Sequence, residues 1–256
     1  MEYASSGTAG NQFPFPMIFI KGTGDAGYLF GDSDKVNIQI NDFYISQYPV
    51  TQNLWNFVTG NNPSHFKGAN RPVESVSFPD ITQEGGFLEK FNALARLNTE
   101  LSPSLVFRLP AESEWEYAAR GGVHWRNGYT FSGSNDMDSA GWYELNAGKL
   151  NDSDIISRLK NQEKGTSTQE VGQKLPNQLG IYDLCGNVWE WCEDFYQPNI
   201  HAIPKDGSPY TEVTGERVLR GGCHHNGAIY CTVSKRYAIT PDAADECIGF
   251  RIAASI

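Results

Sequence analysis

Hydrophobic and polar residues alternate most clearly near the start of the chain. Residues 16–20 (PMIFI) form a short apolar run, and within residues 36–45 Val36, Ile38 and Ile40 alternate with polar neighbours. A period of two places alternate side chains on one face of a strand. We therefore expect a strand with one buried face over each segment.

Three further segments show the spacing of helices. Thr51 is a suitable N-cap for a first helix that ends at Gly60. The second covers residues 86–98, and the third residues 110–122, with a proline at its start and acids in its first turn. Residues 146–169 and 197–215 are polar or rich in turn formers and predict surface loops. Further strands are expected over residues 105–109, 217–219, 231–239 and 248–253.

Composition favours a loop-rich molecule built around aromatic anchors. Hydrophobic residues are 39% of the 256 and aromatics 12%, and there are 26 Gly and 13 Pro. With no break in composition, we expect a flexible segment over residues 1–12 and one domain over residues 13–256. The net charge of -10, without a basic cluster, argues against nucleic acid as a partner.

Targeting and cysteine signals are weak. No run approaches the roughly 18 apolar residues of a transmembrane segment, and residues 1–10 lack the basic and apolar regions of a signal peptide. The chain is therefore predicted to be cytoplasmic, or at the cell surface or extracellular if a leader has been removed. The five Cys cannot all pair and include no C-x-x-C spacing, so free thiols are expected.

Five motifs, in order along the chain, resemble those of the formylglycine-generating enzyme family, also called the sulfatase-modifying-factor domain. They are YPVT (48–51), RLPAESEWEYAARGG (108–122), GNVWEW (186–191), RVLRGG (217–222) and GFR (249–251). The resemblance implies an α+β, C-type-lectin-like fold with little regular secondary structure, a twisted antiparallel sheet and two or three helices. Trp189 and Trp191 are expected to be structural, and Arg108 to pair with an internal acid.

The family's oxidases use two cysteines after the Gly-Gly pair to hold copper, and soft thiolates suit that ion. In register, the second position here is Cys231 but the first is Asn226, and Cys223 could replace it only if the loop were rebuilt. His224 and His225 suggest an iron site like that of related sulfoxide synthases. Neighbours on an extended segment point to opposite faces, however, so we do not expect one.

A third branch of the family consists of variable proteins of diversity-generating retroelements. Adenine-directed mutagenesis there yields Asn, His, Tyr, Ser, Gly, Cys, Ala or Ile but never Lys, Glu, Gln, Met or Trp. The stretch CHHNGAIY (223–230) contains only permitted types and follows neither a strand nor a helix pattern. The resemblance implies a C-terminal variable region over residues 223–245, alternating with framework pieces.

We therefore predict a ligand-binding, receptor-type protein that is not an enzyme and binds an unidentified protein or surface ligand through this region. Exposed apolar groups in such a patch mark a binding surface. The predicted ligand-binding residues are Cys223, His224, His225, Asn226, Gly227, Ala228, Ile229, Tyr230, Tyr237, Ala238, Ile239, Ala243, Ala244 and Asp245.

Two alternatives stay open. The first is a copper-dependent oxidase that converts a peptidyl cysteine to formylglycine, with Cys231 as nucleophile. The second is a calcium-dependent sugar binder. No cofactor is required by the first prediction, but the family's calcium loop matches Asp183, Gly186, Val188 and Glu190, whose oxygens suit a hard cation. Glu190 could equally accept backbone N–H bonds.

Overall fold

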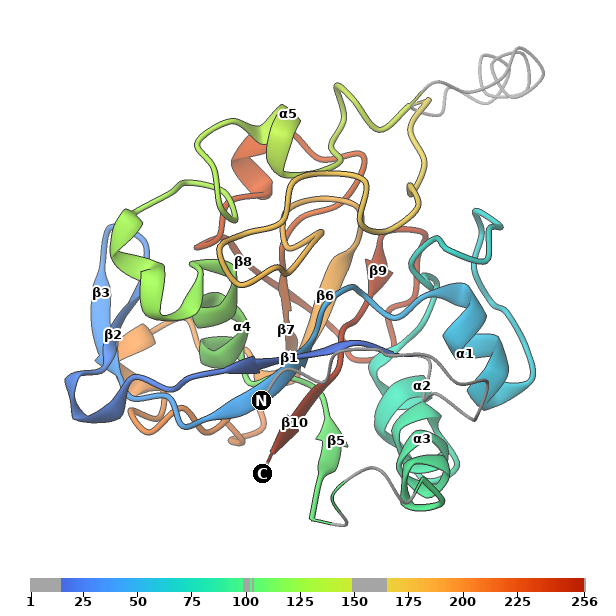
Figure 1. Cartoon of the computed structure of the whole chain (residues 1–256), viewed down its shortest axis with the longest axis horizontal. Coiled ribbons are helices and arrows are strands. Elements are labelled where there is room, and N and C mark those ends of the chain that lie inside the picture. The colour runs from blue at the N-terminus through green and yellow to red at the C-terminus, as the bar shows by residue number, and fades with distance from the viewer. Residues whose placement is uncertain (1–14, 99–101, 103, 149–164, 256) are drawn as a thin grey trace, which may run out of the picture.

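Two four-stranded sheets and a hairpin form the frame of the molecule (Figure 1). The computed structural model describes residues 15–98, 102, 104–148 and 165–255. The first sheet has the order β1 (Met17–Ile20), β4 (Phe43–Ser46), β10 (Ala253–Ser255), β5 (Val106–Arg108), and all its neighbours are antiparallel. The C-terminal strand therefore lies inside the sheet that the N-terminal strand begins.

The second sheet includes parts of three of the family motifs, GNVWEW, RVLRGG and GFR. Its order is β8 (Arg236–Ile239), β7 (Arg217–Arg220), β6 (Trp189–Phe195), β9 (Ile248–Gly249). The β8–β7 and β7–β6 pairs are antiparallel, whereas β6 and β9 are parallel. The hairpin of β2 (Tyr28–Gly31) and β3 (Lys35–Ile38) is separate from both sheets.

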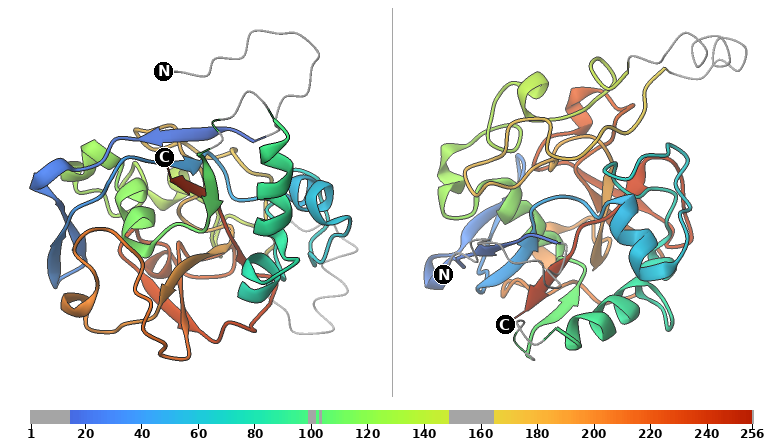
Figure 2. Two further views of the ribbon diagram at one scale, coloured as in Figure 1. Left: turned by 90° about the horizontal axis from the view of Figure 1, so that it is seen from below. Right: turned by 45° about the vertical axis from the view of Figure 1, so that its right-hand side comes forward.

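The helices occupy two places in the fold. Figure 2 shows α1 (Gln52–Thr59), α2 (Phe78–Thr82) and α3 (Phe87–Arg96) grouped on one side in both views. The helix α4 (Glu112–Ala119) packs against β2, β6 and β7. Short elements complete the described part of the chain: α5 (Met137–Ala140), and the 3-10 turns η1 (Gly24–Ala26), η2 (Gly122–Asn127), η3 (Ile200–Ala202) and η4 (Ala228–Tyr230).

Aromatic side chains fill the core beneath both groups of helices. On the α1–α3 side, the rings of Trp55 and Phe87 stack at 5.2 Å, and Phe250 meets Phe87 edge-on at 5.1 Å. Beside α4, Tyr28 and the fully buried Trp115 belong to a second cluster. Such rings bury large apolar areas, so a chain with many loops still has a close-packed interior. No described helix has the length and apolarity to span a membrane.

The expected helices and several strands are confirmed. The Thr51 hydroxyl accepts the Leu54 N–H at the start of α1, and Gly60 ends the helix with a φ of 80°. Three helices of eight or more residues match the predicted three, and short helices α2 and α5 were not foreseen. Residues 1–12 and most of the predicted loop at 146–169 lie outside the described residues.

Other strand predictions were wrong in extent. Residues 36–45 divide into the end of β3 and the start of β4, and residues 248–253 divide between β9 and β10. Only the last four residues of the segment 231–239 form a strand. Strand β6 was missed because its first four residues are all buried, so the alternation that marks a half-buried strand is absent.

Candidate functional site

The segment 223–245 runs from the end of β7 through η4 and β8 towards β9 (Figure 1, orange to red). Its largest hydrophobic side chains are exposed: Ile229 by 73%, Tyr230 by 43% and Tyr237 by 45%. Between them, Cys231 and Val233 are buried in the core. The segment thus alternates between outward side chains and internal anchors.

The other predicted binding residues lie at intermediate or exposed positions, with two exceptions. Cys223 and His224 are buried, so the expectation that they are displayed outward was wrong. Packing explains this, because His224 lies edge-on against Phe66 at 5.3 Å and its Nδ1 is 3.1 Å from the Thr166 hydroxyl. The partly exposed positions are His225, Asn226, Gly227, Ala228, Ala238, Ile239 and Ala243, and the fully exposed ones also include Ala244 and Asp245.

A tight turn after Gly222 sets the direction of the segment. The side-chain oxygen of Asn226 accepts the Cys223 N–H at 3.1 Å, and the Asn226 N–H donates to the Cys223 carbonyl at 3.0 Å. Gly222 has a φ of 75°, and a Cβ there would come within 2.6 Å of the Cys231 sulfur. Residues 223–226 therefore form a turn, and the assumption that His224 and His225 lie on an extended segment was wrong.

A disulfide joins the first residue of the segment to a cysteine just beyond its end. Cys223 and Cys247 are bonded across a sequence separation of 24, which corrects the expectation of five free thiols. Cys185, Cys192 and Cys231 are free and buried. The bond closes the segment into a loop and holds both of its ends against the frame.

The end of the segment is fixed by backbone contacts to the residues around α2. The Ser75 N–H donates to the Asp245 carbonyl at 2.9 Å, and the Phe78 N–H to the Pro241 carbonyl at 3.0 Å. The Asp245 carboxylate accepts the Cys247 N–H at 2.8 Å. These bonds use main-chain atoms, apart from the Asp245 carboxylate, so the exposed side chain of Ala244 can change without loss of the frame.

Two aromatic contacts order the exposed rings. Tyr237, on edge strand β8, stacks on Trp189 of the GNVWEW motif at 5.3 Å between ring centroids. The Lys235 ammonium lies 5.2 Å from the centroid of the Tyr230 ring, within the range of a cation–π contact. Rings held in place lose little rotamer freedom on binding, which favours recognition.

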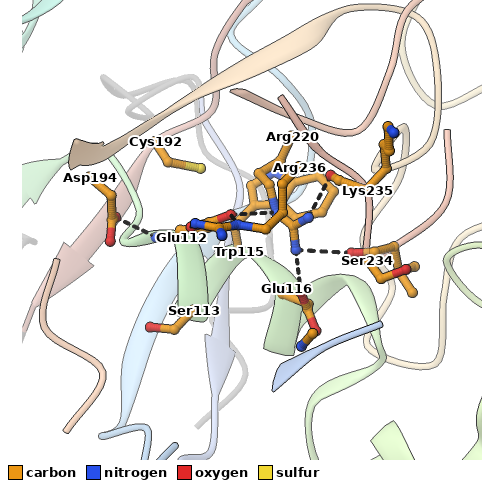
Figure 3. A network of polar contacts seen from close by, with 12 residues as sticks. Glu112, Ser113, Trp115, Glu116, Cys192, Asp194, Arg220, Ser234, Lys235 and Arg236 are labelled. Carbon is orange, nitrogen blue, oxygen red and sulfur yellow. Dashed lines mark hydrogen bonds and ion pairs between the residues drawn. The ribbon is translucent and has the colours of Figure 1, made fainter. Parts of the chain in front are cut away.

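A buried ionic network anchors β8 and β7 to α4 (Figure 3). Arg236, next to Tyr237, forms a bidentate pair with Glu112 at 2.6 Å for both contacts. Arg220 pairs with Glu116, and both residues are fully buried. Buried pairs add little net stability but penalise other arrangements. The network therefore fixes the position of the strand that carries Tyr237.

Cys231, the nucleophile of the oxidase alternative, is enclosed. Burial raises the pKa of its thiol well above the ordinary value, and the buried Cys185 adds to the effect. A thiol of this kind is protonated at neutral pH, whereas thiolates react and bind metal. The nearby Asn226 side chain accepts a hydrogen bond from the Cys223 N–H. Because it is an amide, it cannot supply a second thiolate.

The predicted calcium loop is occupied by protein contacts. Arg251 donates to both oxygens of Glu190 at 2.6 and 2.8 Å, and the Trp115 N–H donates to the same carboxylate. Asp183 accepts the Gly172 N–H at 2.7 Å. The Arg251 guanidinium would repel a divalent cation there, which disfavours Glu190 as a ligand. Calcium binding at this loop stays a prediction.

The motif residues have the structural roles expected of them. Trp191 is buried and donates its indole N–H to the Val76 carbonyl at 3.0 Å. Arg108 forms a bidentate pair with Glu114 at 2.7 Å for both contacts. Arg251 of the GFR motif joins Glu190 of GNVWEW, a partnership that the sequence did not predict.

Comparison with known families supports this description. Residues 8–256 match the model of the sulfatase-modifying factor enzyme 1-like domain. The chain is 37% identical over 223 residues to the chaperone protein LppX of Paenibacillus barcinonensis, covering 76% of this chain and 79% of that protein. It is 33% identical over 189 residues to the formylglycine-generating enzyme of Streptomyces coelicolor, covering 72% of this chain but only 52% of the enzyme's length.

Among solved structures, Treponema denticola variable protein 1 is similar over nearly the whole fold. The TM-score is 0.73 and the sequence identity 28%, covering 93% of this chain and 94% of that protein. These likenesses confirm the predicted mixed α and β fold of the formylglycine-generating-enzyme type.

Proposed function

The chain belongs to the sulfatase-modifying factor enzyme 1-like family, and we propose that it is a member whose C-terminal segment binds a ligand and performs no oxidation. The segment 223–245 presents variable side chains on a fixed frame. The ligand is a protein or a surface-borne molecule, as expected for a receptor-type protein diversified by a retroelement.

The observation that carries this proposal is the division of the segment by exposure. Ile229, Tyr230 and Tyr237 face solvent, although burying such side chains would be favourable by about 1.5–3 kcal/mol each. The frame around them is held by the disulfide, the buried ion pairs and main-chain bonds. Exposed apolar groups on a rigid support are typical of a binding surface.

The relatives support binding in different degrees. The likeness to the Treponema denticola variable protein covers 93% of this chain, and the relative from Paenibacillus is a chaperone by name. The diversified region and its cell-surface display are our extension to this chain.

The test is the DNA downstream of the gene. We expect a near-copy of the bases that encode residues 223–245, differing only at adenines, beside a reverse transcriptase. A gene without such a copy would contradict the retroelement origin of the segment.

Binding itself can be tested on the purified protein. A display library randomised at the exposed residues Ile229, Tyr230 and Tyr237 should yield clones that bind lysozyme and keep the parent melting temperature. A matched library randomised at buried Cys231 and Val233 should yield mainly unfolded clones. Equal loss of folding in both libraries would argue against a variable surface.

The oxidase alternative is supported by the family match and by the 33% identity to the Streptomyces enzyme. It predicts that cuprous ion binds through Cys231 and that a cysteine peptide is converted in the presence of oxygen. We expect no conversion, because the position of the first copper cysteine is Asn226. Conversion by the parent chain that is lost in Cys231→Ser would overturn the ligand-binding proposal.

A further inference from the structure

Two sulfur atoms and an imidazole meet at the base of the segment 223–245. The Sγ atoms of Cys223 and Cys247 and a ring nitrogen of His225 all lie within 4.8 Å of one another. We propose that this cysteine–histidine clasp (Cys223, His225, Cys247) binds one Zn²⁺ ion when its disulfide is reduced. Cys223 and Cys247 supply the sulfur ligands, and both lie outside the two copper positions of the oxidases, which are residues 226 and 231 here.

The sulfur–nitrogen distance already suits zinc, and the two sulfurs have to separate after reduction. The Cys247 Sγ is 3.3 Å from the His225 Nδ1. Tetrahedral zinc with Zn–S of about 2.3 Å and Zn–N of about 2.0–2.1 Å places sulfur and nitrogen about 3.6 Å apart. The Cα atoms of the two cysteines are 5.6 Å apart, so both side chains already point to one place. On reduction the two sulfurs must separate to about 3.8 Å, the spacing that two Zn–S bonds of about 2.3 Å set at a tetrahedral ion, and rotation of the two cysteine side chains can supply this movement.

The surroundings of the clasp support a cation. Both cysteines are buried and His225 is partly exposed, so an ion can enter from the side of the imidazole. Two thiolates balance the charge of Zn²⁺. The Glu246 carboxylate lies within 4.8 Å of ring nitrogens of both His224 and His225, which adds negative charge at the entrance.

His224 lies beside the clasp and does not belong to it. Its Nε2 is 3.6 Å from the Cys247 sulfur, and its Nδ1 is 3.1 Å from the Thr166 hydroxyl. The Nε2 atom is also 3.3 Å from the Glu246 carbonyl, so an Nε2–H shared between that carbonyl and the Cys247 sulfur would orient the thiolate, as outer partners of metal ligands do. The turn closed by Asn226 places the imidazoles of both His225 and His224 next to the Cys247 sulfur, at 3.3 and 3.6 Å.

Three protein ligands leave the fourth position of a tetrahedral ion open. Zinc sites of this type keep a water there, whereas closed structural sites have four protein ligands. The exposed member of the clasp is His225, so the open position is expected on the solvent side of the segment. A donor atom of a bound ligand could replace the water.

The disulfide and the zinc form exclude each other. A dithiol reductant transfers two electrons and two protons to the Cys223–Cys247 bond, giving two thiols and the reductant's own disulfide. Zinc then displaces the two thiol protons and binds both sulfurs. The same residues thus hold the segment closed by a covalent bond in one state and by a metal ion in the other.

The test is metal titration of the whole chain after reduction and removal of metal with a chelator. We expect one equivalent of Co²⁺ to bind with the visible absorption of a tetrahedral site and the near-ultraviolet band of a cobalt–thiolate bond, and Zn²⁺ to displace it. The oxidised chain should bind none. Cys247→Ser should abolish the thiolate band, and His225→Ala should weaken binding by more than about tenfold.

Matched controls are Cys192→Ala, another buried cysteine, and His201→Ala, an exposed histidine paired with Asp34. Both should bind cobalt like the parent. Near-ultraviolet circular dichroism verifies that each variant is folded, and His225→Ala tests the site even if Cys247→Ser does not fold. Failure of the reduced chain to bind one equivalent, or equal binding by His225→Ala, would overturn the proposal. The experiment needs no partner and no template sequence, so its failure is separate from that of the ligand-binding function.

Discussion

Asp183 illustrates how burial changes the chemistry of one side chain. It is buried near the GNVWEW motif and has a φ of 56°, which Asp tolerates better than most residues. Burial raises its pKa from the ordinary value to about 6, although the Gly172 N–H and the charge of Arg251 oppose the change. The folded protein therefore keeps a proton on Asp183 that the unfolded chain loses at about pH 3.9.

This difference predicts how stability depends on pH. The folded state binds more protons between about pH 4 and 6, so the free energy of unfolding should fall as pH rises through that range and then level off. Asp183→Asn keeps an acceptor for Gly172 and should remove up to about 3 kcal/mol of this change. Urea unfolding at several pH values measures it, with exposed Asp25→Asn as the control. Parallel pH profiles for the parent and Asp183→Asn would contradict the prediction.

At the scale of elements, the segment 223–245 depends on how its ends are tied. Its start is joined to Cys247, its middle is anchored by Cys231 and Val233, and β8 is held by the Arg236–Glu112 pair. Each tie uses a buried or covalent contact, whereas Ile229, Tyr230 and Tyr237 between them face outward. Within one segment, some residues therefore stabilise the fold and others are exposed to solvent.

The covalent tie should contribute measurably to stability. Closing a loop of this length removes chain entropy from the unfolded state worth about 3.5 kcal/mol. We expect the parent to lose about that much stability in a dithiol reductant with a chelator present. Cys247→Ala cannot form the bond, so it should be about as stable as the reduced parent both with and without the reductant. Urea unfolding with and without reductant tests this, and equal stability of the parent in both would refute it.

The division of the segment predicts unequal effects of substitution. Ile229→Ser should change the free energy of unfolding by no more than about 0.5 kcal/mol, because the side chain is exposed. Val233→Ala removes two buried methyl groups and should cost about 2 kcal/mol. Chemical denaturation compares the two. A cost for Ile229→Ser equal to that for Val233→Ala would mean that Ile229 has a packing role.

At the scale of the molecule, Arg251 links parts of the chain that are far apart in sequence. It pairs with Glu190 on β6, and its guanidinium donates to the carbonyls of Ser46 at 3.0 Å and Tyr182 at 2.9 Å. The residue thus connects the second sheet to β4 of the first. The GFR and GNVWEW motifs, which identify the family, therefore hold the two sheets together through the contacts of Arg251.

We predict that Arg251→Leu destabilises the protein by about 3–5 kcal/mol, because it leaves Glu190 charged and buried. Glu190→Gln in the same chain should recover part of that loss. The partly exposed pair of Arg108 and Glu114 serves as the control, and Arg108→Leu should cost less. Additive costs in the Arg251→Leu, Glu190→Gln double variant would show that the pair is not coupled.

The sequence alone determined the family and much of the fold, because these depend on local patterns. Caps and glycines set the ends of α1, and long motifs mark the domain. The exposure of Ile229, Tyr230 and Tyr237 also followed from the segment, because residues chosen for packing would show a periodic pattern.

Only the tertiary structure decided which distant residues meet. Cys223 and Cys247 are 24 residues apart, and Glu190 and Arg251 are 61 apart. Nothing in the spacing of such residues specifies a contact, because the turn at Asn226 and the pairing of β6 with β9 bring them together. The disulfide, the inward position of His224 and the cluster around His225 therefore appear only when the chain is folded.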